Sequence, residues 1–250
     1  MPRISRGLER IKALVIAVMC MVAAPTVCSA QVTVTVADYD DVPTEQVEIA
    51  KDTVDIMQRS MESEFGATLD TDVVITLHNG NNPDSNRTKG NAELGAINIW
   101  LEKNDPEFKV AFLVSHELTH QYQIERVGKE TLNQNMWFTE GMADIIGART
   151  ANHYSNGQFK AFARSAYYKT KSGRPVHLYE HERRWNWLDG YNNGVPVYAK
   201  ADLAMIYLNS KYQPMLMWSY LYMLKNCGNA SDALKNTYGI TTRELDKLIG

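Results

Sequence analysis

One stretch decides the fold expected for this chain: Ala111-Phe112-Leu113-Val114-Ser115-His116-Glu117-Leu118-Thr119-His120. His116 and His120 are four positions apart, so on an α-helix both imidazoles lie on one face, one turn apart. Both can then reach a single metal ion at about 2.0–2.1 Å, the usual distance between zinc and a histidine nitrogen. Glu117 follows on the same helix, where a carboxylate can take a proton from water as a general base. The stretch therefore predicts a metal-binding helix.

The residues around this HExxH pattern favour a buried helix. The five-residue pattern alone would arise by chance in roughly one sequence in a hundred of this composition, so its context matters. Asn104-Asp105-Pro106 offers a capping residue followed by proline, a combination common at the first turn of a helix. Apolar residues then recur at helical spacing through residues 106–122. We therefore expect both histidines to lie on a helix that packs into the core.

A second motif follows the first: Trp137-Phe138-Thr139-Glu140-Gly141-Met142-Ala143-Asp144. Thr139 is a residue type that caps helices, so we expect it to begin a second helix with Glu140 in the first turn. A carboxylate oxygen is, like an imidazole nitrogen, a common zinc ligand. The motif therefore predicts the third metal ligand.

An HExxH pattern followed about twenty residues later by Trp-x-x-Glu-Gly-x-Ala-Asp resembles the gluzincin clan of zinc metallopeptidases, which includes thermolysin-like and aminopeptidase-like enzymes. The resemblance implies that His116, His120 and Glu140 hold one zinc ion (Zn²⁺) per chain and that Glu117 is the catalytic base. It also implies that Asp144 orients the first histidine, a carboxylate role that fixes the imidazole tautomer.

Two observations narrow which zinc metallopeptidases the chain resembles. Metzincins fit poorly, because Gln123 and Arg126 stand where that group has glycine and histidine. The aminopeptidase motif Gly-Ala-Met-Glu-Asn is absent, and Glu93 in Asn91-Ala92-Glu93-Leu94 is a weak substitute for it. Endopeptidase and exopeptidase action therefore both stay open.

The segment Pro196-Val197-Tyr198-Ala199-Lys200 resembles an aminopeptidase-type segment whose tyrosine hydrogen-bonds the tetrahedral intermediate. It also follows Glu140 at about the separation found in that family. The resemblance implies an oxyanion-stabilising role for Tyr198, with Tyr191 as the competing candidate. A tyrosine that simply packs in the core is the third interpretation.

A competing zinc pattern, the inverted HxxEH, occurs at His177-Leu178-Tyr179-Glu180-His181. It follows Ser172-Gly173-Arg174-Pro175 and runs directly into the charged residues 182–184. No apolar helix is available there to hold two imidazoles rigidly. We therefore expect a turn at the surface or at the rim of a cleft.

The order of the expected elements predicts an α+β fold. A small mixed sheet flanks the zinc helix, and a mostly helical part follows, which resembles a zincin-like catalytic domain. Residues 31–250 would form that single domain, with an α/β part at 31–103 and the helices at 104–250. By the same resemblance, the strand Gly95–Trp100 would line the cleft and pair with an extended peptide. Strands are expected at 31–39, 72–78 and 96–101, and helices at 43–65, 106–122, 158–170, 198–208, 214–226, 229–238 and 241–249.

Residues 1–30 have the layout of a secretory signal peptide. Four basic residues precede the apolar run 13–24, and Cys28-Ser29-Ala30 provides small residues before a cleavage site at Gln31. About twelve apolar residues are too few to span a bilayer, so no stable membrane span is expected after cleavage. The mature protein would be periplasmic or extracellular.

The composition suits a soluble globular protein, with 44% hydrophobic and 22% charged residues over 250 positions. The net charge of −3 argues against nucleic acid or an anionic membrane as the main partner. We therefore expect a secreted zinc metallopeptidase that acts on peptide or protein substrates. The alternative is a secreted binding protein on the same scaffold, with a structural or vestigial zinc site; the oligomeric state is open.

Overall fold

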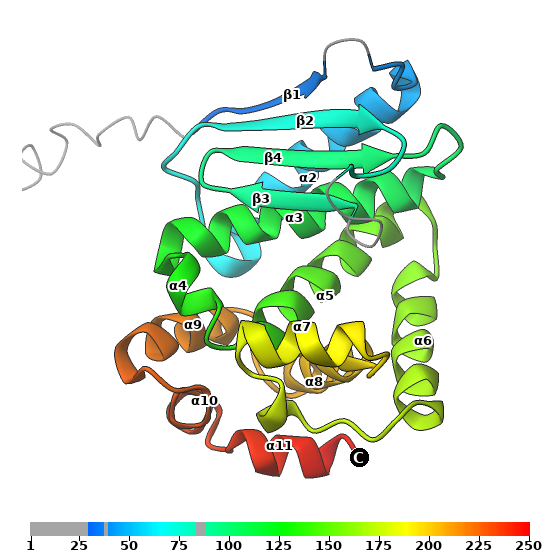
Figure 1. The fold of residues 1–250 in the computed structure, drawn as a ribbon. Helices are drawn as coiled ribbons and strands as arrows, with labels where there is room; N and C mark the ends of the chain where they lie inside the picture. The colour runs from blue at the N-terminus through cyan, green and yellow to red at the C-terminus, as the bar shows by residue number, and fades with distance from the viewer. Residues whose placement is uncertain (1–29, 38–39, 84–88) are drawn as a thin grey trace, which may run out of the picture.

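The structure is a computed structural model and describes residues 30–37, 40–83 and 89–250 (Figure 1). The expected signal peptide lies outside the described residues, apart from Ala30. Within the described part of the chain, no helix combines the length and the apolar character needed to cross a membrane.

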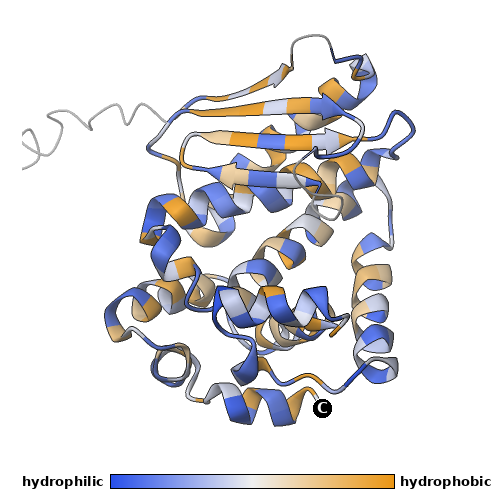
Figure 2. Cartoon of the chain, viewed as in Figure 1, coloured by the Kyte–Doolittle hydropathy of each residue, from blue (hydrophilic) through white to orange (hydrophobic). Residues whose placement is uncertain are grey.

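A four-stranded mixed sheet forms one layer, in the order β1-β2-β4-β3. Strands β1, β2 and β4 are parallel, and the short strand β3 runs antiparallel to β4 at the edge. Along β2 the side chains of Val73 and Ile75 are fully buried, whereas Val74 is 44% exposed. One face of the sheet therefore packs on helices (Figure 2). The strands are β1 (Val32–Val36), β2 (Val73–Asn79), β3 (Gly90–Glu93) and β4 (Ala96–Leu101).

Two long helices, α2 (Thr44–Phe65) and α3 (Glu107–Val127), cover that face (Figure 1). Helix α2 buries an apolar stripe that includes Ala50, Met57 and Met61. It ends at Gly66, whose left-handed backbone (φ 60°) lets its N–H bond to the carbonyl oxygen of Glu62. The sheet and α2 thus support α3 from one side.

Helices make up the rest of the described chain. The central one, α5, is buried along most of its length and packs between α3 and α8. Gly141 permits this, because a Cβ atom there would lie 2.7 Å from Cγ of Met205 and 3.0 Å from the carbonyl oxygen of Ala201. The remaining elements are α4 (Lys129–Leu132), α5 (Met136–Tyr154), α6 (Gln158–Ser172), the 3₁₀ turn η1 (Leu178–Glu180), α7 (Arg184–Asn192), α8 (Val197–Lys211), α9 (Leu216–Cys227), α10 (Ala230–Tyr238) and α11 (Thr242–Leu248).

The predicted α+β class, with a small mixed sheet and a helical second half, is confirmed. One cluster of buried side chains runs from Ile75 in the sheet through Leu118 in α3 to Met205 in α8. The sheet and the helices therefore share a continuous core.

The prediction about the strand that lines the cleft was wrong. Strand β4 pairs with β2 on one side and β3 on the other, so its backbone hydrogen-bonding groups are already used inside the sheet. The edge position belongs to β3, which lies within a stretch that the sequence did not predict as a strand. A peptide that added to this side of the sheet as a further strand would have to pair with β3, because β4 is already paired on both sides.

The predicted helix caps were also wrong. Helix α5 begins at Met136, so Thr139 lies inside it, with its hydroxyl donating to the carbonyl oxygens of Leu132 and Asn135. At the start of α3, Asp105 accepts a hydrogen bond from the backbone of Glu102 instead of capping the helix.

Candidate metal centre

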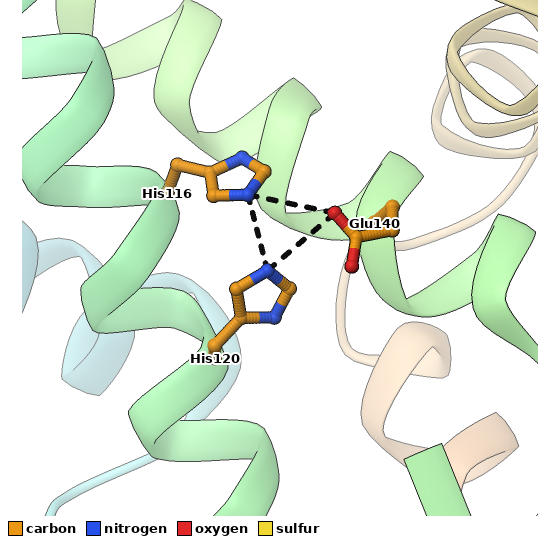
Figure 3. Close-up of side chains that lie close together, drawn as sticks. All are labelled: His116, His120 and Glu140. Atoms are coloured by element: carbon orange, nitrogen blue, oxygen red, sulfur yellow. Dashed lines mark hydrogen bonds and ion pairs between the residues drawn. The ribbon is translucent and has the colours of Figure 1, made fainter. Parts of the chain in front are cut away.

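Two neighbouring helices bring three potential metal ligands together. His116 and His120 lie on successive turns of α3, and both rings point toward the carboxylate of Glu140 on α5 (Figure 3). The Nε2 atoms of the two histidines are 3.1 Å apart. They lie 3.6 and 3.7 Å from Oε2 of Glu140, respectively. Each of the three side chains is 13% exposed, so the centre is nearly buried yet reachable.

This triangle of atoms fits one zinc ion. A tetrahedral ion with bonds of about 2.0–2.1 Å holds its ligand atoms about 3.3–3.4 Å apart. The observed separations of 3.1, 3.6 and 3.7 Å lie on either side of that value. Two imidazoles and one carboxylate form the donor set of zinc sites that keep a fourth position for water or substrate. The three residues can therefore hold zinc with little rearrangement.

Asp144 lies behind the first histidine, one turn after Glu140 on α5. Its Oδ1 is 2.8 Å from Nδ1 of His116, an ion-pair distance, although the angle between the two groups falls outside that of a hydrogen bond. A carboxylate here keeps the proton on Nδ1 and leaves Nε2 free to bind a metal. The structure thus brings Asp144 into contact with His116.

Gln123 contacts the second histidine, and the sequence reasoning missed it. Its Oε1 is 2.9 Å from Nδ1 of His120, and its Nε2 donates a 3.1 Å hydrogen bond to the carbonyl oxygen of Thr139. The side chain is fully buried. A polar residue three positions after a helical histidine is the signal that would have found it, because residues at that spacing are neighbours.

Glu117 lines the same cavity as the histidines and is only 6% exposed. The backbone of Gly90 packs directly on it, since a Cβ atom at Gly90 would lie 2.6 Å from Cδ of Glu117. Burial raises the pKa of the Glu117 carboxyl, and the nearby charges of His116 and His120 offset this only in part. The group is therefore more basic than an ordinary glutamate.

The three potential ligands strongly shift one another's pKa values. Burial alone would lower the pKa of His116, but Asp144 and Glu140 more than reverse this, so its pKa lies well above the ordinary value. The pKa of His120 is raised in the same way, mainly by Glu140. Burial opposes ionisation of Glu140, but the two histidines lower its pKa to below the usual range. Glu140 is therefore ionised and available as a ligand.

The centre opens into a cleft with a volume of about 570 Å³. Strand β3 and helix α3 form one wall, and α7 with the start of α8 forms the opposite one. A cleft of this size holds several amino-acid residues of an extended chain. Its lining includes Gly90, Asn91, Ala92, Glu93, Phe112, His116, Glu117, His120, Glu140, Arg184, Tyr191 and Tyr198.

Tyr198 and its competitor Tyr191 both line this cleft. Tyr198 lies in the first turn of α8, where its ring packs edge-on against Trp187 at 4.8 Å and Tyr191 at 5.3 Å. Burial, helped by the negative charge of Glu140, raises the pKa of Tyr198 well above its ordinary value. Its hydroxyl therefore keeps its proton and can donate a hydrogen bond.

The inverted pattern at residues 177–181 forms a 3₁₀ turn whose two histidines have separate partners. Nδ1 of His177 lies 2.7 Å from Oδ2 of Asp246, and Nδ1 of His181 lies 3.0 Å from the carbonyl oxygen of Asn186. Within the described residues, the one cluster with metal-binding geometry is that of His116, His120 and Glu140.

Comparison with known proteins does not assign the chain to a family. No protein-family model matches it, and a search of curated proteins finds no match. The feature that points to a function is therefore the centre itself.

Proposed function

We propose that this chain is a zinc-dependent metallopeptidase of the gluzincin type, with a zincin-like fold, that hydrolyses peptide bonds. The observation that carries the proposal is the triangle of His116, His120 and Glu140, with Glu117 beside it at the base of a cleft. Zinc bound there would polarise a carbonyl group and lower the pKa of water to about 7. The expected export to the periplasm or the extracellular space is part of the same proposal.

Glu117 is proposed as the general base and then the general acid. It takes a proton from the attacking water as the water oxygen bonds to the carbonyl carbon, and it gives that proton to the amine nitrogen as the C–N bond breaks. Its raised pKa supports both steps, because a group that accepts and then donates a proton works best near the ambient pH. Burial against Gly90 holds the carboxylate in place.

Tyr198 is proposed to stabilise the negative charge that develops on the carbonyl oxygen. Its hydroxyl keeps its proton, and the residue lines the same cleft as Glu140. Removing one preorganised donor of this kind typically costs about 3 kcal/mol of transition-state stabilisation. Tyr191 lies in ring contact with Tyr198 and is the alternative donor.

The edge strand β3 is a second observation in favour of a peptide substrate. Among the described residues, β3 pairs only with β4, and its residues Gly90–Glu93 line the cleft. An extended peptide can add to such an edge through backbone hydrogen bonds, so that side-chain contacts set the specificity. The proposed substrates are therefore peptides or unfolded segments of proteins, and the net charge of −3 argues against nucleic acid.

The test is zinc content together with cleavage of a peptide library. We expect one zinc ion per chain, and cleavage that a chelator abolishes and added zinc restores. The Glu117→Gln variant, loaded with zinc, is the control for contaminating peptidases. Stoichiometric zinc without any cleavage would favour the alternative, a secreted binding protein with a structural or vestigial metal site.

A further inference from the structure

One buried side chain touches both helices of the proposed metal centre. We propose that Gln123 is a positioning residue, which sets the tautomer of His120 and ties the helix of the third ligand to α3. This inference rests on the metal site of the proposed function, but not on peptide hydrolysis. It concerns a residue that the HExxH pattern and the Glu140 motif do not include.

The backbone of α5 determines which way the Gln123 amide faces. The carbonyl oxygen of Thr139 can only accept a hydrogen bond, so the amide group 3.1 Å away must present its NH₂ to it. The amide oxygen of Gln123 then faces Nδ1 of His120, at 2.9 Å. That oxygen can only accept, so Nδ1 must carry the proton.

A proton on Nδ1 has a direct consequence for the metal site. The neutral imidazole of His120 then has its lone pair on Nε2, the atom that lies 3.1 Å from Nε2 of His116 and 3.7 Å from Glu140. The ring is thus presented in the tautomer that binds zinc. Without Gln123, the proton could move to Nε2 and compete with the metal.

The second bond of Gln123 acts on the other helix. Thr139 immediately precedes Glu140, and its carbonyl lies in the first turn of α5. Gln123 is fully buried and Thr139 is 3% exposed, so water does not replace this bond. One amide therefore couples the orientation of one ligand to the position of another, across the most extensive helix pair in the described chain, α3 with α5.

Gln121 offers a matched control on the same helix. It is also fully buried, and its Oε1 accepts a 3.1 Å hydrogen bond from the backbone N–H of Gly95. It contacts neither histidine through a hydrogen bond. Gln121→Met and Gln123→Met therefore each remove one fully buried side-chain amide. Only Gln123→Met removes an amide that contacts a proposed metal ligand.

The experiment measures zinc affinity by competition with a chromophoric chelator. We expect Gln123→Met to bind zinc about 10- to 100-fold more weakly, as is typical when the hydrogen-bond partner of a metal ligand is lost. Gln121→Met should bind as the wild type does. Gln123→Glu keeps an acceptor for His120 but loses the donor to Thr139. Its zinc affinity should therefore lie between that of Gln123→Met and that of the wild type.

A spectroscopic readout separates positioning from general damage to the fold. In ¹⁵N-edited spectra of the zinc-loaded protein, the Nδ1 proton of His120 should exchange slowly in the wild type and in Gln123→Glu, and rapidly in Gln123→Met. The Nδ1 proton of His116, held by Asp144, is the internal reference and should not change.

Two results would overturn the proposal. One is a folded Gln123→Met protein with wild-type zinc affinity and an unchanged His120 proton. The other is an equal loss of affinity in Gln121→Met, which would make the effect one of core packing. A wild-type chain that binds zinc in a Gln123-dependent way but cleaves no peptide would contradict the peptidase proposal and leave this inference standing.

Discussion

Gly90, at the start of the edge strand, packs directly against the carboxylate of Glu117. A Cβ atom at Gly90 would lie 2.6 Å from both Cγ and Cδ of that side chain, which is closer than real carbon contacts allow. The two residues are far apart in the sequence, yet the edge strand determines where the proposed base can lie. The strand therefore contributes to the position of the catalytic group as well as to the wall of the cleft.

Gly90→Ala should lower kcat while leaving zinc content unchanged. The added methyl group displaces the Glu117 carboxylate, and a shift of about 1 Å in a catalytic group can cost about 100-fold in rate. The measurement is kcat with metal analysis of the same sample, and circular dichroism checks that the variant is folded. Wild-type kcat in a folded Gly90→Ala protein would show that the strand does not position the base.

Glu117→Gln should retain zinc but lose turnover, whereas His120→Ala should lose both. The amide cannot accept the proton of the attacking water, and general acid–base catalysis is worth about 10²- to 10⁴-fold. Steady-state rates and metal analysis on matched preparations check the pair. Full activity in Glu117→Gln would show that another group is the base.

Zinc affinity should fall as the pH falls. The fall should begin at a higher pH than it would if the two histidines had ordinary pKa values. Burial alone would lower the pKa of His116, but Asp144 and Glu140 raise it well above its ordinary value, and the pKa of His120 is raised too. Zinc binds only neutral imidazole, so protons compete with it until the pH exceeds these raised values. Chelator competition at about pH 6, 7 and 8 measures the slope. A flat profile would contradict the prediction.

Asp202→Asn should stabilise the metal-free protein at neutral pH. Burial, together with the neighbouring Asp144, raises the pKa of Asp202 well above its ordinary value. Above about pH 4 the unfolded state releases the Asp202 proton, whereas the folded state still holds it. The free energy of unfolding therefore falls as the pH rises from about 4 toward the pKa of Asp202 in the folded state. Asparagine is neutral at every pH and avoids that loss.

Urea unfolding at about pH 4 and pH 7 tests this prediction. The free energy of unfolding of Asp202→Asn should exceed that of the wild type at neutral pH, and the difference should be small in acid. An Asp202→Asn protein that is less stable than the wild type at pH 7 would show that the ionised carboxylate is needed for the fold.

Asp246→Asn should destabilise the fold without weakening zinc binding. Asp246 pairs with the buried ammonium of Lys200 at 3.3 Å, and it also accepts from His177 and the backbone of Leu178. Leaving a buried charge without its partner typically costs about 3–5 kcal/mol. Chemical denaturation and zinc titration measure the two effects.

A second substitution provides the control. Adding Lys200→Met to Asp246→Asn removes the unpaired charge and should recover part of the lost stability. If Asp246→Asn alone lost zinc affinity, the ion pair between α8 and α11 would be coupled to the metal centre, and the prediction would be wrong.

The sequence could predict much of the local structure and the composition of the centre. Helical spacing places His116 and His120 on one face, whatever the rest of the fold does, because that geometry is local. Glu140 could be identified from its motif, and the order of strands and helices follows from periodicity and from breaks such as Gly66. The proposed signal peptide, activity and zinc binding stay predictions.

How distant segments meet could not be predicted from the sequence and is seen only in the folded chain. Strand β3 has four residues and no alternating apolar pattern, so its presence depends on pairing with β4 and could not be predicted locally. The contacts of Gly90 with Glu117 and of Gln123 with Thr139 likewise join segments from different elements. Such contacts depend on how helices and sheet pack, and packing is a property of the whole chain. The identity and spacing of the residues therefore indicate which side chains can form the centre, whereas the packing of the folded chain holds them in place.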